Sequence, residues 1–185
     1  MSERFDLAAG EEHRYDLQRT LQTGSTITFY SDKYDSTQRN SIDEIKLWDE
    51  SDFVMLSIMV RRDERRLAFN TQDKDQRWGH EHSISIEGIF NLHDTTFQVI
   101  VQRLSFVVKI DDEIVSVQPK RSSGAVRRVS YLNHHKSESL FANSLQVTVT
   151  TPPAYSCNCS VALTDRARLV QDIPNRLPSS APYLL

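Results

Sequence analysis

The sequence predicts an all-β fold, an antiparallel β-sandwich of two sheets. Hydrophobic and polar residues alternate with a period of two along most of the chain, and long segments of helical periodicity are missing. The alternating segments are short and follow one another at intervals of roughly ten residues, with polar turns between them. We therefore expect helix only as single turns.

The expected strands follow one another from Thr26 to Thr150. The first begins after a turn at Gly24. In the strand from Phe53 to Arg61, every second residue from Val54 to Val60 is apolar. The opposite face therefore carries Phe53, Met55, Ser57, Met59 and Arg61. The apolar residues that share one face in the other strands are Ile27 and Phe29; Leu67 and Phe69; Ile84 and Ile86; Phe97, Val99 and Val101; Phe106, Val108 and Ile110, followed by Ile114; and Leu145, Val147 and Val149.

Composition changes after residue 151. Five of the six prolines lie in the last 35 residues. We expect one domain over residues 1–150 and a proline-rich C-terminal extension over residues 151–185, with an edge strand at residues 158–164 and a flexible tail from Gln171. The chain of 185 residues is long enough for one domain with a substantial core.

Net charge, apolar run length, the N-terminal residues and cysteine placement narrow the range of possible functions and locations. The net charge of -3 gives no reason to expect nucleic-acid binding, and the longest apolar run, Phe53 to Leu56, is too short for membrane insertion. The N-terminus lacks the basic and apolar regions of a signal peptide. Cys157 and Cys159 leave the preceding residues without a disulfide. We therefore expect a cytoplasmic protein, for which export to the extracellular space would need a leaderless route.

The segment Arg77-Trp78-Gly79-His80-Glu81 is the strongest functional signal. Its tryptophan follows a polar loop and precedes an alternating strand. Without this context, the better interpretation of Trp78 would be a buried core aromatic. A flat aromatic ring takes the apolar side of a pyranose, while nearby Asn, Arg and Glu side chains can bind its hydroxyls. The alternation places Arg61, Asn70 and Glu81 on the same side as Trp78. They could converge with it on one concave sheet surface that binds carbohydrate, where Arg61 and Glu81 would pair with each other while they bind hydroxyls.

Over roughly residues 15 to 150 the chain resembles the galectins, most closely the galectin-like lectins of fungi. The resemblance rests on the strand ending in Arg61, on Leu67-Ala68-Phe69-Asn70, on Trp78-Gly79-His80-Glu81 and on the paired strands 97–101 and 106–111. It implies a jelly-roll sandwich and sugar-binding activity. In that family the sugar contacts come from a His, an Asn and an Arg spaced two apart, then an Asn, a Trp, a Glu and a second Arg.

Transferred residue by residue, the resemblance assigns the carbohydrate site to Ser57, Met59, Arg61, Asn70, Trp78, Glu81 and Ser83. Ser57, Met59 and Ser83 stand where the family has His, Asn and Arg. The loss of two hydrogen bonds costs roughly 2–6 kcal/mol when their partners stay unsatisfied. A millimolar complex is worth only about 4 kcal/mol, so β-galactoside binding should be weakened or altered. Met59 also suggests tolerance of an apolar group such as an N-acetyl methyl.

Other motifs have simpler interpretations. His80 and His82 could begin a metal site, but they are in phase with Ile84 and Ile86, which favours structural or rim positions. Cys157 and Cys159 lack the redox spacing and are expected to be free thiols. The sequence lacks a nucleophile motif and a phosphate-binding glycine loop, and only Glu81, with Asp73 or Asp75, offers a carboxylate pair, so we expect no enzyme activity.

We thus expect a carbohydrate-binding lectin without cofactor or metal, whose partners are glycans or glycoconjugates. The alternative is a galectin-fold module that binds a protein and no sugar. Members of the family often associate through strand edges, so the resemblance allows a homo-oligomer. A proline-rich tail that covers an edge would instead keep the chain monomeric.

Overall fold

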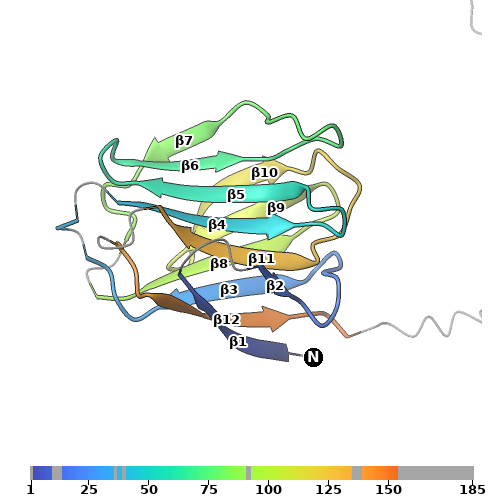
Figure 1. The fold of residues 1–185 in the computed structure, drawn as a ribbon, viewed down its shortest axis with the longest axis horizontal. Coiled ribbons are helices and arrows are strands. Elements are labelled where there is room, and N and C mark those ends of the chain that lie inside the picture. Colours follow the sequence, from blue (N-terminus) through green and yellow to red (C-terminus); the bar gives the residue numbers. More distant parts are fainter. Residues whose placement is uncertain are drawn as a thin grey trace, which may run out of the picture. The chain divides into compact units, whose positions relative to one another are not determined.

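Two antiparallel sheets face each other in the computed structural model (Figure 1). The structure describes residues 2–9, 14–35, 37–38, 41–90, 93–134 and 139–153, all within one compact unit, Met1–Pro153. The expected edge strand over residues 158–164, the tail, Cys157 and Cys159 lie outside the described residues. In the described part of the chain all regular elements are strands, and no helix is long and apolar enough to cross a membrane.

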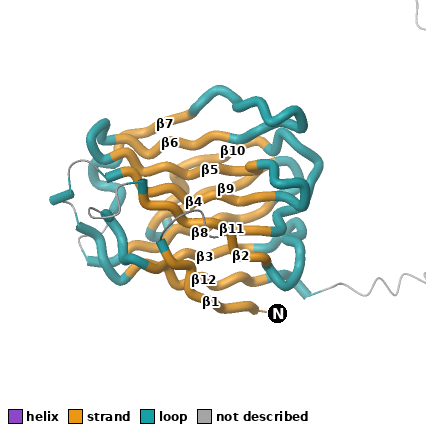
Figure 2. The backbone as a smooth tube through the Cα atoms, in the orientation of Figure 1, coloured by secondary structure: helices purple, strands orange, loops and turns teal. Residues whose placement is uncertain are grey.

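The strands pair only with antiparallel neighbours. Sheet 1 has the order β1-β12-β3-β8-β9-β10, and sheet 2 has the order β2-β11-β4-β5-β6-β7 (Figure 2). The strands of sheet 1 are β1 (Ser2–Ala8), β12 (Ser144–Thr150), β3 (Thr26–Ser31), β8 (Thr95–Val101), β9 (Ser105–Ile110) and β10 (Glu113–Pro119). Those of sheet 2 are β2 (Arg14–Asp16), β11 (Arg128–Asn133), β4 (Ile42–Trp48), β5 (Val54–Arg61), β6 (Arg66–Asn70) and β7 (His82–Ser85).

The predicted all-β sandwich is confirmed, but four strands have no counterpart in the prediction: β1, β2, β4 and β11. For β4 the reason is clear. Its inner face carries Asp43 beside Ile45 and Leu47, and its outer face carries Ile42 and Trp48. A charged residue inside and apolar residues outside hide the period of two.

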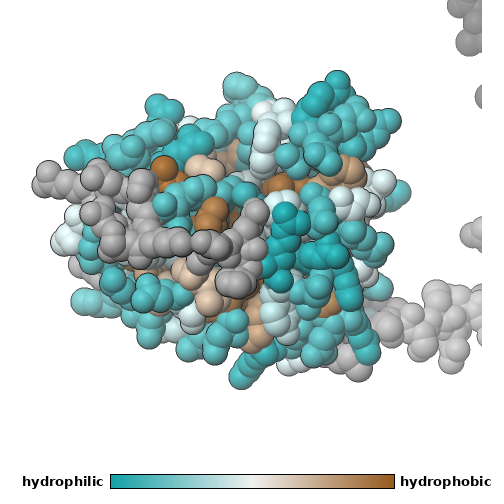
Figure 3. All heavy atoms as spheres, viewed as in Figure 1, coloured by the Kyte–Doolittle hydropathy of each residue, from teal (hydrophilic) through white to brown (hydrophobic). Residues whose placement is uncertain are grey.

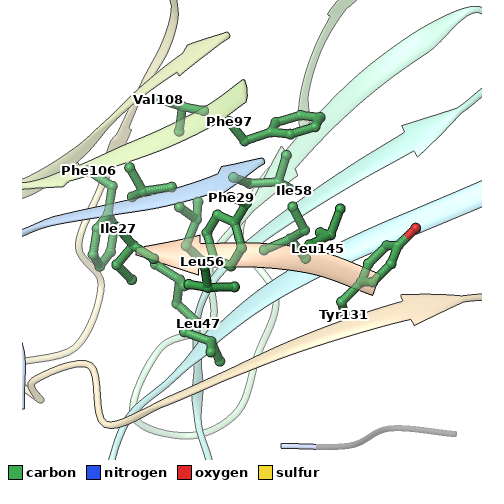
Figure 4. Close-up of a cluster of buried hydrophobic side chains, with 14 of the residues drawn as sticks. Ile27, Phe29, Leu47, Leu56, Ile58, Phe97, Phe106, Val108, Tyr131 and Leu145 are labelled. Atoms are coloured by element: carbon green, nitrogen blue, oxygen red, sulfur yellow. The ribbon is translucent and has the colours of Figure 1, made fainter. Parts of the chain in front are cut away.

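The core fills the space between the sheets (Figure 4). The side chains labelled there come from both sheets: Ile27, Phe29, Leu47, Leu56, Ile58, Phe97, Phe106, Val108, Tyr131 and Leu145. The alternation of Leu56, Ile58 and Val60 toward the core is confirmed. Met55 was expected on the opposite face but is buried too, because a β-bulge makes it the extra residue between the pairs Leu47–Leu56 and Trp48–Val54.

The buried Asp43 carboxylate is the centre of a polar cluster at the core. It accepts hydrogen bonds from Tyr131 Oη (2.8 Å), Asn133 Nδ2 (3.0 Å), Ser139 Oγ (2.9 Å) and the Leu140 amide (3.1 Å). Burial, and then the charge of Asp43, raises the pKa of the Tyr131 hydroxyl far above its ordinary value. A fully paired carboxylate of this kind is structural, because every donor around it belongs to the protein.

Candidate carbohydrate-binding site

The outer face of sheet 2, which points away from the core, carries the candidate site. Figure 3 shows this side of the molecule as largely hydrophilic with several hydrophobic side chains among the polar ones. Strand register places the residues in rows across the sheet. Lys46, Ser57 and Asn70 form one row, and Glu44, Met59, Ala68 and Ser83 form the next. Residues in a row are neighbours on adjacent strands, so their side chains share one surface.

A cavity of about 380 Å³ opens on this face. Its volume lies within the range typical of small-ligand sites, roughly 300–1,000 Å³. Of the seven residues assigned to the site from sequence, six line the cavity: Ser57, Met59, Arg61, Asn70, Trp78 and Glu81. Ser83 is not among the lining residues. It lies on the edge strand β7, where it pairs with Ala68 of β6. The structure therefore brings six of the assigned residues to the cavity wall, and Ser83 lies next to them on the same face of the sheet.

Arg61 and Glu81 form the pair expected from sequence. Arg61 Nη1 and Nη2 donate to the two carboxylate oxygens of Glu81 at 2.9 and 2.8 Å. Burial alone would lower the pKa of the Arg61 guanidinium, but the hydrogen bonds and charge of Glu81 outweigh it and raise this pKa. Arg61 Nε also donates to Met59 Sδ at 3.1 Å. A planar, bidentate pair is rigid, so it presents its remaining donors and acceptors to a ligand in fixed directions.

Trp78 is 47% exposed, in contrast to the buried core aromatics. It pairs with Gln72 through an isolated β-bridge, in a hairpin closed by hydrogen bonds between the Asp73 and Arg77 backbones and from Gly79 N to Thr71 O. The Asp73 carboxylate accepts hydrogen bonds from the backbone amides of Arg77 and Asp75. These bonds lower the pKa of the Asp73 carboxyl, and the bond from Arg77 has the largest effect. The structure thus excludes the interpretation of Trp78 as a core residue.

Gly79 explains part of the Trp-Gly-x-Glu motif. A Cβ atom at this position would lie 2.6 Å from Nη1 of Arg121 and 3.3 Å from Oδ1 of Asn70. Arg121 also lies 3.6 Å from Asp73 through its Nη2 atom. A glycine therefore lets the Trp78 hairpin approach Arg121 and Asn70 closely.

Asn70 lines the cavity, and a backbone hydrogen bond defines the orientation of its amide. Its Oδ1 accepts a hydrogen bond of 2.8 Å from the Thr71 amide. A backbone N–H can only donate, which assigns the oxygen to that position and leaves Nδ2 as the donor on the other side. Asn70 can therefore donate to an acceptor on a bound ligand.

Sequence reasoning missed two residues on β4, Glu44 and Lys46, that also line the cavity. The Glu44 carboxylate is buried and accepts from Ser57 Oγ at 2.8 Å. It also lies 3.2 Å from Lys46 Nζ and 3.1 Å from His134 Nε2. The alternation of Glu44 and Lys46 with Ile45 and Leu47 was the signal that could have found them.

The environment of Ser57 corrects the expectation of an exposed groove residue. Ser57 is only 4% exposed, because it lies between Lys46 and Asn70 in the centre of the sheet. Its hydroxyl proton is directed to Glu44. Ser57 therefore forms the floor of the cavity and offers a ligand only the lone pairs of its oxygen.

A larger cavity of about 630 Å³ lies at the rim, where its lining comes from the Trp78 hairpin, β7 and β10. His82 is exposed there, with Nδ1 at 3.5 Å from Ser116 Oγ and 3.4 Å from Gln118 Nε2, a rim position as the sequence suggested. The lining of this larger cavity includes no Trp, Tyr or Phe side chain on which a sugar could stack, so the smaller cavity is the better sugar site. Within the described residues, no group of three or more His, Cys, Asp or Glu is placed to hold a metal ion.

The fold is that of the galectins. Sheep galectin-11, in a complex with glycerol, matches with a TM-score of 0.58 and 11% sequence identity over 77% of this chain and 100% of that chain. The galectin LEC-6 of Caenorhabditis elegans matches with a TM-score of 0.59 and 14% identity over 80% of this chain and 95% of that chain. No protein-family model matches the sequence, and neither does any curated protein sequence.

At 11% and 14% sequence identity, the structural likeness shows a galectin-like sandwich. It does not by itself assign a role to any residue of the cavity. Both neighbours are animal proteins, so the closer resemblance to fungal lectins stays a prediction. The strand order and the outer face of sheet 2 give the frame in which Trp78, Arg61, Asn70 and Glu81 meet.

Proposed function

We propose that this protein is a lectin, which binds a glycan on the outer face of sheet 2 without catalysing a reaction. The observation that carries the proposal is the half-exposed Trp78 ring beside a cavity whose wall contains the bidentate Arg61–Glu81 pair. A sugar has an apolar ring face and a polar hydroxyl edge, and this cavity offers a partner for each.

Each residue has a role in this proposal. Trp78 stacks on the pyranose ring, and Asn70 donates from Nδ2 to a ring substituent. Arg61 and Glu81 exchange hydrogen bonds with adjacent hydroxyls while they hold each other in place. Ser57 and Met59 shape the floor and no longer supply the donors that the family's His and Asn would provide, so affinity for plain β-galactosides is weak or altered.

The carboxylates of the cavity suit binding better than catalysis. A glycosidase needs a carboxyl group that delivers a proton to the leaving oxygen. Glu81 is bound by Arg61 and Glu44 by Lys46, so each is engaged with a cation that fixes its position. Both carboxylates can accept hydrogen bonds from sugar hydroxyls in this arrangement.

A glycan array with the full-length protein tests the proposal. We expect selective binding that disappears in Trp78→Ala and survives in Leu104→Ala, a control that truncates an exposed apolar residue on the turn between β8 and β9. Binding that persists unchanged in Trp78→Ala would refute this site. If protein shown to be folded binds no glycan on the array, the lectin function is refuted.

The second candidate is a galectin-fold module that binds a protein and no sugar. The observation in its favour is the cavity floor, where the Ser57 hydroxyl proton is already used by Glu44 and Met59 replaces a polar side chain. A silent array together with a partner protein whose binding requires Trp78 would support it.

Association through strand edges, cytoplasmic location and leaderless export also remain proposals. The edges of sheet 1 are β1 and β10, and those of sheet 2 are β2 and β7. Light scattering on the full-length protein gives the oligomeric state directly: a mass of about 21.3 kDa would show a monomer, and a multiple of it a homo-oligomer.

A further inference from the structure

We propose that the protein has a second binding site, at the rim cavity of about 630 Å³, which takes a short extended peptide with an acidic side chain. The inference does not depend on the lectin function proposed above. It comes from three features of the cavity: the free edge of β10, the donors that gather beside this edge, and the absence of a carboxylate among the described residues that line the cavity.

The rim cavity runs along the edge of strand β10. This strand is the last one of sheet 1, and β7 is the last one of sheet 2, on the same side of the sandwich (Figure 2). Five consecutive residues of β10, Val115 to Pro119, line the cavity. Successive side chains of a strand point to opposite faces, so a cavity that all five residues line follows the strand edge, where the main-chain groups lie.

The main chain of β10 has groups that a further strand can use. The Lys120 amide donates to the Leu104 carbonyl at 2.9 Å, on the side of β9. Main-chain groups alternate in direction along an antiparallel strand, so Gln118 also faces β9, and Val117 directs its N–H and C=O to the free edge. Pro119 faces the free edge as well and offers only its C=O. One residue of an incoming peptide can therefore form both hydrogen bonds of a ladder pair with Val117.

Two features limit this edge to a short partner. A β-bulge between Ile114 and Ser116 breaks the register on one side of Val117, and Pro119 lacks a donor on the other side. Bulges and prolines on an edge strand hinder its pairing with a long strand of another copy. A short peptide needs only the ladder pair at Val117 and the groups next to it.

The rest of the lining supplies donors. It includes His80, His82 and Arg121, and the described residues of the lining include no Asp or Glu. Gln118 Nε2 can only donate and lies 3.4 Å from His82 Nδ1, so a neutral His82 ring carries its proton on Nε2. A set of donors without a carboxylate favours an anionic group as the ligand.

Arg121 supplies the positive charge of the rim cavity. Its guanidinium lies against Gly79 and has two long contacts, from Nη2 to Asp73 Oδ2 at 3.6 Å and from Nη1 to the main-chain oxygen of Arg77 at 3.5 Å. The Asp73 carboxylate is shared with Arg77, whose Nε lies closer, at 3.2 Å. The charge of Arg121 is therefore only partly compensated, and its remaining N–H groups can bind a carboxylate of a ligand.

Antiparallel pairing sets the order of side chains in the peptide. The residue opposite Val117 shares a face with this valine, which is 58% exposed, so an apolar residue fits there. The peptide runs against β10, so its residue four positions earlier lies next to Arg121. The ligand is thus an extended segment in which an acidic residue precedes a β-branched residue by four positions.

Two-dimensional 15N NMR titration of the full-length protein with the peptide acetyl-Glu-Thr-Val-Thr-Val-Thr-amide tests the site. We expect saturable shifts of the Val117 and Arg121 amides and an unmoved Ser57 amide in the sugar cavity. Replacing the glutamate of the peptide with glutamine should weaken binding by about threefold or more, because the ion pair is lost.

N-methylation of the peptide tests the strand pairing. A methyl group on the nitrogen of the second valine removes a hydrogen bond to Val117 and should weaken binding about tenfold. The matched control carries the methyl group on the preceding threonine, whose N–H points away from β10, and should bind like the parent peptide. Inorganic phosphate, the probe for a simple anion site, should bind more weakly than the peptide.

Variants of the protein locate the contact. Val117→Asp should weaken peptide binding about tenfold, whereas Ile114→Asp, also exposed on β10 but outside the cavity lining, should leave it unchanged. Arg121→Gln should reduce the affinity of the glutamate peptide to that of the glutamine peptide. The NMR spectrum reports whether each variant is folded; should Arg121→Gln disturb the Trp78 hairpin, Val117→Asp and its control carry the test.

Four results would overturn the proposal. The first is that no peptide binds, and the second is that both N-methylated peptides bind equally well. The third is that phosphate binds as tightly as the peptide, which would make the cavity a simple anion site. The fourth is a dimer in light scattering that Val117→Asp dissociates, which would assign this edge to a second copy of the chain.

Discussion

The two tryptophans of the chain lie on the same face of sheet 2 but in opposite surroundings. Trp48 is 5% exposed, donates from Nε1 to Ser130 Oγ at 2.9 Å and is covered by the Arg14 guanidinium 3.8 Å from its ring centroid. Trp78 is 47% exposed at the edge of a cavity. At Trp48 the protein itself supplies the stacking partner and the hydrogen-bond acceptor. At Trp78 a ligand can supply the stacking partner.

Replacing Trp48 should have the largest effect on the protein. In Trp48→Ala we expect the free energy of unfolding to fall by about 3–5 kcal/mol, because a buried indole, its hydrogen bond and its stacked cation are all lost. Urea unfolding measures the change. A loss below about 1 kcal/mol would mean that the ring contributes little and that the contrast with Trp78 is wrong.

Replacing Trp78 should affect binding and not stability. In Trp78→Ala we expect glycan affinity to fall at least tenfold, about 1.4 kcal/mol. The free energy of unfolding should stay within about 0.5 kcal/mol of wild type, as for other surface positions. Calorimetric titration and urea unfolding of the same samples give both numbers. A destabilisation of several kcal/mol would place this ring in the core.

Removing the Arg14 side chain that stacks on Trp48 should have a smaller effect on stability. Arg14→Ala takes away a cation–π contact and a salt bridge to Asp52, for which we expect a loss of about 0.5–1 kcal/mol in stability. Acrylamide should then quench tryptophan fluorescence more strongly, because Trp48 becomes accessible. Arg103→Ala, on the turn between β8 and β9, is the matched control. Unchanged quenching in Arg14→Ala would show that Arg14 does not shield Trp48.

Acid should weaken the site at Trp78, because the hairpin that carries this ring depends on the Asp73 carboxylate. Hydrogen bonds from the Arg77 and Asp75 amides lower the pKa of Asp73 below the ordinary 3.8, so its carboxylate stabilises the hairpin fully above that pH. This contribution is lost as the pH falls below 3.8 and through the folded pKa.

We therefore expect glycan affinity to decrease below this pH more steeply in wild type than in Asp73→Asn, which cannot titrate at this position. Fluorescence-detected titration at a series of pH values compares the two proteins. Parallel profiles would show that Asp73 does not support the Trp78 hairpin.

The sequence was informative where alternation and burial agree. The strand from Val54 to Arg61 has apolar residues on its inner face and Ser57, Met59 and Arg61 on its outer face, which sufficed to place these three beside Asn70 and Glu81. Trp78 was recognisable because a polar hairpin surrounds it. The pairing of Arg61 with Glu81 followed from the chemistry of the two side chains.

The remaining parts of the site were missed where the alternation is broken at the ends of a strand or where a contact between strands decides the arrangement. On β4 the buried Asp43 and the outward Trp48 reverse the usual distribution, so the strand and its cavity residues Glu44 and Lys46 were not predicted. Ser83 was assigned by transfer from the family motif, yet it lies at the edge of sheet 2 outside the cavity lining. The direction of the Ser57 hydroxyl depends on Glu44, a residue on a neighbouring strand.

The two indole N–H signals offer the most direct test of the account, because the chain contains only two tryptophans. In a 15N NMR spectrum, Trp78→Phe assigns them, and the wild-type protein is then titrated with the oligosaccharide that gives the strongest array signal. We predict a saturable shift of the Trp78 indole and an unmoved Trp48 indole. Saturable binding that leaves Trp78 unmoved would show that the sugar binds elsewhere and would contradict the proposed site.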